Sequence, residues 1–318
     1  MNYRDFGKSG INVSEVGFGS WAIGGNQHGI SYGPVDDKES SLAVEKAIEM
    51  GCNYFDTADV YGWGHSEEIL GSVLKAHRDR VIIASKVGSD FYQGYGFQTF
   101  SEEYIRYAFR KSLSRLKTDY LDVYQLHNPP LELIVKEETF AALEALKKEG
   151  KIRAWGLSVT TAEEAAAALA ASKPDCIQIP LNLFSKDEQL INDVLPQCYR
   201  RGCALIAREP LANGFLTGKY RPDSTFASGD MRHSWPRDYV SARAEAARQL
   251  TFLEEQTERS LAQAALQWVL KFEQIAVVIV GCKTREQVIE NLSASGKPAL
   301  KPDELRRIEE LKERDFGL

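Results

Sequence analysis

The 318-residue sequence lacks a long hydrophobic run, and no stretch reaches the length that a helix needs to span a bilayer. Its N-terminus, MNYRDFGKSG, has no apolar core of the kind that marks a secretion signal. Cysteine and histidine are scarce, with five of each. The cysteines form no CxxC pair and the histidines are scattered. These absences predict reduced, mostly buried thiols in a cytoplasmic protein, and they argue against a metal site.

An excess of positive charge is also absent. The chain carries 39 Lys and Arg against 45 Asp and Glu, for a formal net charge of -6. A chain with this balance is not expected to bind nucleic acid or an anionic membrane surface non-specifically. Its composition, 43% hydrophobic and 26% charged, is typical of a globular protein. The expected partner is a small molecule, and the sequence leaves the oligomeric state open.

Short apolar runs alternate with helical patterns along the whole chain. The runs are continuous rather than alternating, which indicates strands buried on both faces, as in a parallel sheet. Eight strand–helix repeats over this length predict an α/β fold, a closed (β/α)8 TIM barrel that forms one domain over residues 1–318. The expected strands are 16–19, 54–55, 81–85, 123–126, 154–159, 176–179, 204–207 and 276–280.

Helical spacing of apolar residues, capping signals and turn residues complete the predicted fold. Two extended pieces within 1–13 predict a β-hairpin ahead of the first barrel strand, and the aromatic-containing polar segment 220–239 predicts a lid-like loop. An open doubly wound sheet is the competing fold, but it usually carries a phosphate-binding glycine motif after the first strand that is not found here. The expected helices are 38–50, 66–76, 101–116, 137–149, 161–171, 187–201, 260–272, 285–294 and one from 302 onward.

Four polar side chains follow three successive predicted strands. Asp56 ends one strand and Tyr61 follows five residues later on a glycine-rich turn, while Lys86 and His127 end the next two strands. Functional groups collect at the C-terminal ends of barrel strands, so these four side chains should meet. An ammonium beside a phenol lowers the phenol pKa from about 10, and a carboxylate keeps the ammonium charged. The group suits protonation of a carbonyl oxygen.

Two other interpretations of these residues stay open. Asp56 and Lys86 alone can be a structural ion pair, and His127 alone can be a core histidine. Lys86 can also be the nucleophile of a Schiff-base barrel enzyme, although a neighbouring carboxylate disfavours this by holding the amine charged.

The motifs that carry these residues are FDTADVYG, the pair Ser85–Lys86, and YQLHNPP. With them, the chain resembles the aldo-keto reductases over nearly its whole length. The resemblance implies a catalytic tetrad of Asp56, Tyr61, Lys86 and His127, and an NADPH-dependent reduction of aldehydes or ketones to alcohols. It also implies an alternative. Some members, such as potassium-channel β subunits, bind the nicotinamide cofactor as accessory or sensing subunits.

The same resemblance implies a cofactor site built from GLSV, QIPLNLF, PLANGFLTGKY and GCKTREQVIENL. Two positions depart from the family pattern. Arg208 stands where a tyrosine often stacks on the nicotinamide, and Val159 replaces an asparagine. The implied cofactor residues are Trp21, Ser158, Gln178, Arg208, Pro210, Leu211, Gly214, Gly218, Lys219, Gly281, Lys283, Thr284, Arg285, Gln287, Glu290 and Asn291.

The residues themselves favour NADP over NAD. Lys283, Thr284 and Arg285 lie between the last predicted strand and a helix N-terminus, where cations, a hydroxyl and free N–H groups suit a phosphate. The ribose of NAD usually needs a carboxylate instead. No metal is expected, and the sequence does not identify the carbonyl substrate. The predicted substrate-pocket residues are Trp21, His28, Trp63, Tyr92 and Trp235.

Overall fold

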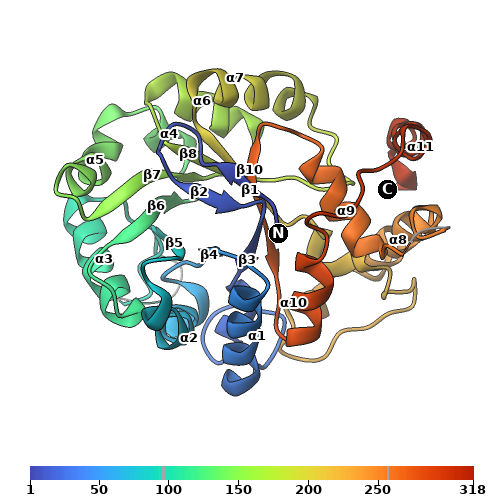
Figure 1. The fold of residues 1–318 in the computed structure, drawn as a ribbon, viewed down its shortest axis with the longest axis horizontal. Helices are drawn as coiled ribbons and strands as arrows, with labels where there is room; N and C mark the ends of the chain where they lie inside the picture. Colours follow the sequence, from blue (N-terminus) through green and yellow to red (C-terminus); the bar gives the residue numbers. More distant parts are fainter. Residues whose placement is uncertain (93, 95–96, 256–257) are drawn as a thin grey trace.

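The computed structural model describes residues 1–92, 94, 97–255 and 258–318. Eight parallel strands close into a barrel in the order β10–β3–β4–β5–β6–β7–β8–β9, and helices surround the barrel (Figure 1). The predicted (β/α)8 barrel is therefore confirmed.

Each barrel strand overlaps one of the predicted apolar runs. Most strand residues are buried on both faces, because one face points into the barrel and the other packs against the helices. The strands are β3 (Val16–Gly19), β4 (Tyr54–Asp56), β5 (Ile82–Val87), β6 (Leu121–His127), β7 (Ile152–Ser158), β8 (Cys176–Pro180), β9 (Ala204–Arg208) and β10 (Ile275–Gly281).

The helices form the outer layer and largely follow the predicted ranges. Ser101 caps α3 as expected, because its side chain accepts a hydrogen bond from the Tyr104 N–H. Helix α7 is preceded by a π-helical stretch, Leu190–Val194. The helices are α1 (Asp37–Glu49), α2 (His65–Leu74), α3 (Glu102–Leu116), α4 (Leu131–Ile134), α5 (Ala141–Lys148), α6 (Ala162–Ala171), α7 (Leu195–Arg201), α8 (Arg237–Arg248), α9 (Leu261–Leu270), α10 (Arg285–Leu292) and α11 (Pro302–Glu313).

Helix α8 is absent from the sequence-based expectation, and it shortens the predicted loop 220–239 because it begins at Arg237. Its buried face consists of Val240, Ala244, Ala246 and Ala247. Alanine contributes little to a hydrophobic pattern, so a helix that packs through alanines leaves a weak periodic signal in the sequence.

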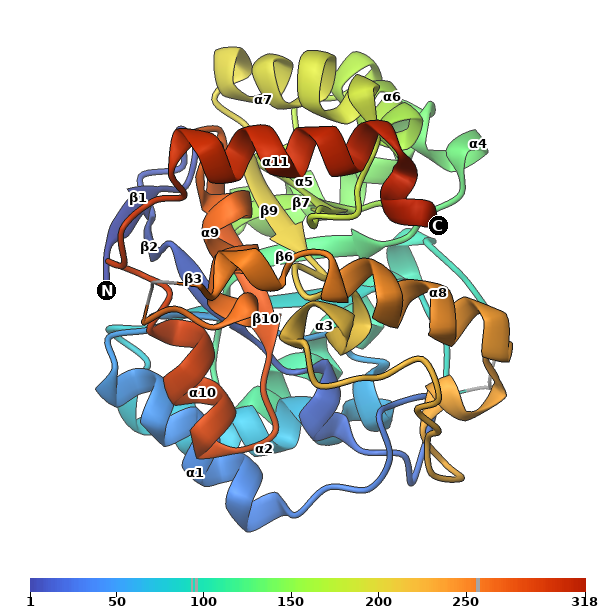
Figure 2. The same ribbon diagram turned by 90° about the vertical axis from the view of Figure 1, so that its right-hand side faces the viewer.

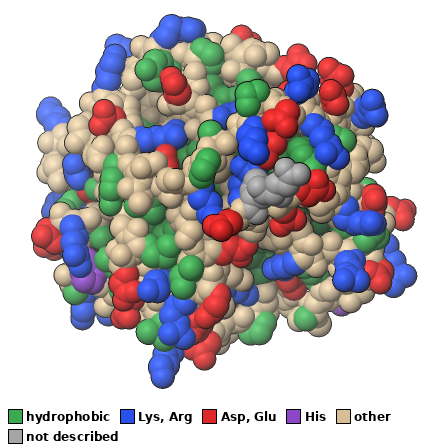
Figure 3. All heavy atoms as spheres, turned by 45° about the vertical axis from the view of Figure 1, so that its right-hand side comes forward, with side chains coloured by type: hydrophobic (Ala, Val, Ile, Leu, Met, Phe, Trp, Pro, Cys, Tyr) green, Lys and Arg blue, Asp and Glu red, His purple; other side chains and the backbone are tan. Residues whose placement is uncertain are grey.

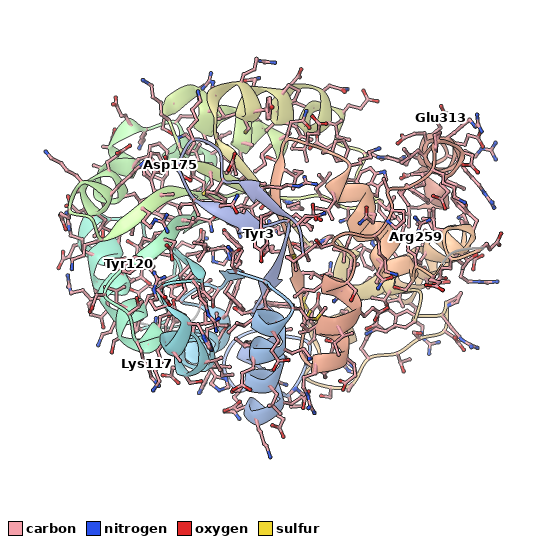
Figure 4. All side chains as sticks on the ribbon, in the orientation of Figure 1. Tyr3, Lys117, Tyr120, Asp175, Arg259 and Glu313 are labelled. Atoms are coloured by element: carbon pink, nitrogen blue, oxygen red, sulfur yellow. The ribbon has the colours of Figure 1, made fainter. Side chains whose placement is uncertain are left out.

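A two-stranded antiparallel hairpin closes the N-terminal end of the barrel, which confirms the predicted hairpin. It pairs β1 (Tyr3–Asp5) with β2 (Asn12–Ser14), and Figure 4 labels Tyr3 on it. Phe6 and Val13 are fully buried in the cluster that fills the barrel interior. The Phe6 ring stacks on Tyr54 of β4, with 5.9 Å between ring centroids.

Two long loops meet at the opposite end, outside the C-terminal ends of the strands (Figure 2). One follows β3 and the other follows β9. The Met231 N–H donates to the Ser31 carbonyl at 2.9 Å, and the Tyr32 hydroxyl donates to the Asn213 side chain at 2.8 Å. The two loops therefore span the mouth of the barrel together.

Charged side chains of both signs are interspersed on the face shown in Figure 3. None of the helices in the described part of the chain combines the length and apolar character that crossing a bilayer requires.

Because α2 packs closely on the end of α3, replacing Gly71 by alanine should destabilise the protein, although alanine has the higher helix propensity. A Cβ on Gly71 would lie 2.2 Å from the Arg115 carbonyl oxygen and 2.7 Å from the Leu116 Cα. Alanine favours a helix by about 1 kcal/mol over glycine, but a clash with backbone atoms costs more. We expect Gly71→Ala to lower the free energy of unfolding by about 1–3 kcal/mol in urea denaturation.

Ser72→Ala, on the exposed side of the same helix, is the control and should leave stability nearly unchanged. A Gly71→Ala protein as stable as the wild type would contradict the close approach of the two helices.

Candidate active site

The side chains that point inward at the C-terminal end of the barrel are polar, whereas most of those deeper inside are apolar. Asp56, His127 and Ser158 are the last residues of β4, β6 and β7, and Lys86 lies one residue before the end of β5. The strands are in register there, with His127 opposite Ser158 and Ser158 opposite Gln178 of β8. The barrel thus gathers these residues into one layer.

The Lys86 ammonium is the centre of this layer. Its Nζ donates to Asp56 Oδ1 at 2.5 Å, to the Thr57 carbonyl at 2.8 Å and to Tyr61 Oη at 3.2 Å. The Lys86 and Asp56 side chains are only 0% and 2% exposed. All three ammonium protons have acceptors, which is the condition for burying this charge.

The loop after β4 continues to follow β5 and so brings Tyr61 above Lys86. The Thr57 N–H donates to the Ala84 carbonyl at 2.8 Å, and the Asp59 N–H donates to the Lys86 carbonyl at 3.2 Å. Gly62 then turns with a φ of 61°, and a Cβ there would lie 2.2 Å from the Gly24 carbonyl oxygen. Only glycine fits at this position.

The charge states of the Lys86–Tyr61 pair follow from burial and contact. Burial alone would lower the pKa of the Lys86 ammonium, but Asp56 and Tyr61 more than offset this, and the pKa lies above its ordinary value. Burial raises the pKa of the Tyr61 phenol, while Lys86 and Arg208 act to lower it. The lowering by Lys86 is expected from the sequence, but the larger effect of burial is not. Because burial outweighs the cations, the phenol holds its proton at neutral pH.

His127 completes the group from the side of the Tyr61 ring. The two rings meet edge to face, with 5.8 Å between centroids. Burial lowers the pKa of His127 well below its ordinary range, and the cations Lys86 and Arg208 lower it further. Its Nδ1 is buried and has no hydrogen-bond partner among the described residues. A neutral imidazole therefore lies beside the phenol.

Gln178 and Ser158 support Asp56 from the far side. Gln178 Nε2 donates to Asp56 Oδ2 at 2.8 Å, and the Ser158 hydroxyl donates to Gln178 Oε1 at 3.4 Å. Both carboxylate oxygens of Asp56 therefore have donors.

A cavity of about 900 Å³ opens above this layer and extends to the start of α10. Tyr61, His127 and Asp56 line one end, together with Asn128, which the sequence argument did not single out. Twelve of the predicted cofactor residues also line the cavity: Trp21, Gln178, Arg208, Pro210, Leu211, Gly214, Lys219, Gly281, Lys283, Gln287, Glu290 and Asn291.

The remaining predicted residues lie elsewhere. Ser158, Gly218, Thr284 and Arg285 are not part of the cavity lining. His28 and Trp63 stack on each other, 4.9 Å between centroids, and line a smaller cavity of about 300 Å³.

Tyr92 and Trp235 are also placed away from the cavity lining. The Tyr92 hydroxyl accepts a hydrogen bond from Arg115 at 2.7 Å, which ties it to α3. Trp235 packs on Phe215 and Tyr239. Both aromatic residues therefore contact other side chains rather than the cavity.

Cations gather at the other end of the cavity. Lys283 Nζ donates to the carbonyls of Tyr32 at 2.7 Å and Pro34 at 3.4 Å. Burial lowers the pKa of Lys283, and the nearby Arg232 and Lys219 lower it further while Asp230 opposes them. This end is suited to anionic groups, because several cations are crowded there.

Arg232 joins the two loops over this end, and sequence reasoning missed it. Its guanidinium pairs with Asp230, donates to Tyr220 Oη at 2.7 Å and to the Asn213 carbonyl at 3.0 Å, and lies over the Tyr32 ring at 4.3 Å. The only sequence signal was an arginine among aromatic residues in the predicted loop.

Arg208 extends from the end of β9 into the cavity wall. It forms an ion pair with Glu209, and its NH2 group donates to the Val159 carbonyl at 3.1 Å. Glu209 has a φ of 57°, which places this pair on a sharp turn.

Asp59 is a second buried carboxyl, three residues after Asp56, that sequence reasoning also missed. It is 0% exposed, and its carboxyl has no side-chain hydrogen-bond partner among the described residues. Burial and the nearby Glu67 raise its pKa well above the ordinary range, and Arg115, the Val60 backbone N–H and Lys86 oppose this only in part. Asp59 is therefore expected to carry a proton in the folded protein.

Comparison with known proteins places the chain among oxidoreductases. The model of the Aldo/keto reductase family matches residues 15–313. The uncharacterized oxidoreductase YqkF of Bacillus subtilis is 32% identical over 320 residues, which cover 99% of this chain and 98% of the relative. A probable voltage-gated potassium channel subunit beta of Oryza sativa is 31% identical, with 97% and 96% covered.

A solved structure gives the same result. The chain superposes on the holo form of aldo-keto reductase AKR11C1 from Bacillus halodurans with a TM-score of 0.81 and 30% identity, over 98% of this chain and 96% of that one. The TM-score for the apo form of the same protein is 0.70 at the same coverage. The overall backbone of this chain is therefore more similar to the holo form.

Asp59→Asn tests the protonated carboxyl. A raised folded-state pKa means that wild-type stability falls as pH rises above the unfolded value of about 3.9, and the variant lacks this loss. The free energy of unfolding of Asp59→Asn, relative to that of the wild type, should therefore increase as the pH rises. The increase should be at most about 1.4 kcal/mol per pH unit. Urea denaturation between about pH 4 and pH 8 measures the difference.

Asp79→Asn, at an exposed position, corrects for the general loss of one negative charge. If the two variants respond to pH alike, Asp59 is ionised in the folded protein and this assignment is wrong.

Proposed function

The chain belongs to the aldo/keto reductase family, and we propose that it is an NADPH-dependent oxidoreductase that reduces aldehydes, and also ketones, to alcohols. One observation carries the proposal. Tyr61 contacts both a fully buried ammonium, Lys86, and a neutral imidazole, His127, at one end of a cavity of about 900 Å³. This arrangement suits an acid that protonates a carbonyl oxygen.

The cavity residues fit a dinucleotide in two respects. Its volume lies in the upper range of pockets that enclose small molecules and cofactors. Its cationic end, with Lys283 and Lys219, suits phosphates, and its other end offers the Gln178 amide to a carboxamide. The closer similarity to the holo form of AKR11C1 supports the same assignment. When bound, NADPH supplies the hydride.

Tyr61 has the role of proton donor. As the carbonyl carbon accepts the hydride, the carbonyl oxygen takes the phenolic proton, and the products are an alcohol and a phenolate. The Lys86 ammonium, 3.2 Å from Tyr61 Oη, stabilises that phenolate. Neutral His127 can donate one N–H to the carbonyl oxygen and so orient it. Asp56 keeps Lys86 charged and in place.

The geometry disfavours the Schiff-base alternative. A nucleophilic lysine needs a free amine, but contact with Asp56 and Tyr61 keeps the pKa of Lys86 raised. Its three protons are all donated to acceptors, so attack on a carbonyl would require the hydrogen bonds to Asp56, Thr57 and Tyr61 to break.

A nicotinamide-binding sensor or accessory subunit with little turnover is the second candidate. It is favoured by the relative from Oryza sativa that is named a probable potassium channel subunit beta. The contact network around Tyr61 favours catalysis over this role.

We also propose that residues 1–318 act as one barrel domain in the cytoplasm. All five cysteines are unpaired and buried, which supports a reducing compartment.

Tyr61→Phe tests the proton donor. The variant lacks the phenolic proton but keeps the ring, so turnover of an aldehyde panel should fall by about 10²–10⁴-fold. Its Kd for NADPH, followed by fluorescence, should stay within about threefold of the wild type because the hydroxyl contacts Lys86 rather than the cationic end.

Tyr199→Phe, at an exposed position on α7, is the matched control and should retain activity. Substantial turnover by Tyr61→Phe would remove Tyr61 as the acid. A wild-type protein that binds NADPH tightly but reduces no carbonyl would instead support the sensor.

A further inference from the structure

The start of α10 already holds an anion, and that anion belongs to the protein. Oε1 of Glu39, in the first turn of α1, accepts from the Arg285 backbone N–H at 3.1 Å and from Arg285 Nε at 3.3 Å. Its Oε2 accepts from the Arg285 NH2 group at 3.4 Å. One carboxylate therefore takes both the helix N-terminus and the guanidinium, which are the donors that would otherwise suit a phosphate.

This pair does not line the large cavity itself, but Arg285 lies between two residues that do. Lys283 and Gln287, which flank Arg285 in the sequence, both line the cavity. Helices α1 and α10 lie side by side on the outside of the barrel (Figure 1). The Arg285 and Glu39 side chains are 47% and 29% exposed, so their contact can be exchanged for one with another anion.

Among the described residues, Arg285 is the cation that pairs with Glu39, whereas Lys283 is held by two backbone carbonyls. A nucleotide 2′-phosphate that approaches Arg285 must displace the carboxylate and also meets its negative charge. A ribose 2′-hydroxyl meets no such penalty, because a carboxylate can accept its hydrogen bond.

We propose that Glu39 is a specificity-determining residue that lowers the affinity for 2′-phosphorylated nucleotides, without preventing their binding, by competing for the anion position at the start of α10. The proposal rests on the nicotinamide-dependent function proposed above. It assigns the discrimination between NADPH and NADH to a residue on α1, about 250 positions away from the phosphate-binding candidates in the sequence.

Glu39→Gln is the direct test, with NADPH and NADH titrated by fluorescence. Removing the charge frees Arg285 for the 2′-phosphate, so the Kd for NADPH should fall by about five- to twentyfold. The Kd for NADH should stay the same or rise slightly. Titration with adenosine 2′,5′-bisphosphate and with 5′-ADP should give the same contrast, which isolates the phosphate from the nicotinamide.

Two controls accompany the test. Glu45→Gln removes one charge from an exposed position of the same helix and should change neither Kd. Arg285→Met in the Glu39→Gln background should abolish the gain for NADPH, because the guanidinium is the group that is released. Should Glu39→Gln fold poorly, as judged by thermal unfolding, Glu39→Ala repeats the comparison.

The outcomes separate this inference from the proposed function. If the wild type binds both nucleotides, and Glu39→Gln changes the two Kd values equally or not at all, the role of Glu39 is wrong. The proposed oxidoreductase function would be unaffected by that result. A wild-type protein that binds neither nucleotide would overturn both proposals.

Discussion

The buried ion pair between Lys86 and Asp56 is the interaction on which the rest of the site depends. A pair removed from water stabilises a protein only when each remaining donor and acceptor is satisfied, and otherwise its desolvation is destabilising. Here the Thr57 carbonyl and Tyr61 take the other Lys86 protons, and Gln178 donates to the second Asp56 oxygen. The ends of β4, β5 and β8 must therefore keep their relative positions for the charges to be tolerated.

This requirement links stability to chemistry through Tyr61. Excluding water raises the pKa of its phenol, which in the proposed reaction would keep the proton in place until a carbonyl oxygen takes it. The Lys86 ammonium lowers the cost of the phenolate that remains. An exposed phenol would lack the strong Coulomb interaction with the ammonium, and a buried phenol without Lys86 would not release its proton. The two opposing effects are both needed.

The sequence was sufficient to predict the barrel and the members of this layer, because both leave local signals. Asp56, Lys86 and His127 each end an apolar run, and a parallel barrel brings the ends of its runs together. Helix α8 was not predicted because its buried face is made of alanines. The net direction of the Tyr61 pKa was not predicted either, because burial depends on the complete packed structure.

Contacts between residues far apart in the sequence, at and near the cavity, could not be predicted either. The Tyr32 hydroxyl and Asn213 are 181 positions apart, and Glu39 and Arg285 are 246 apart. Loop conformation sets the first contact and the packing of α1 against α10 sets the second, and neither leaves a periodic pattern in the sequence. Asp59 illustrates the same limit, because its sequence context suggests an exposed loop carboxylate and only the packed structure reveals its burial.

The two ends of the cavity differ in charge, and this difference defines the direction in which an elongated anion can bind. At the barrel end, Asp56 neutralises Lys86, and the pKa of His127 is lowered so far that it adds no charge. At the loop end, Lys219 and Lys283 face the cavity; burial lowers the pKa of Lys283, and the cations Arg232 and Lys219 lower it further. A dinucleotide would gain most with its phosphates at the loop end and its uncharged carboxamide ring over the layer, since at the barrel end Lys86 and Arg208 are already paired with Asp56 and Glu209. The same charge pattern that makes the buried layer stable therefore also orients the molecule that the layer would act upon.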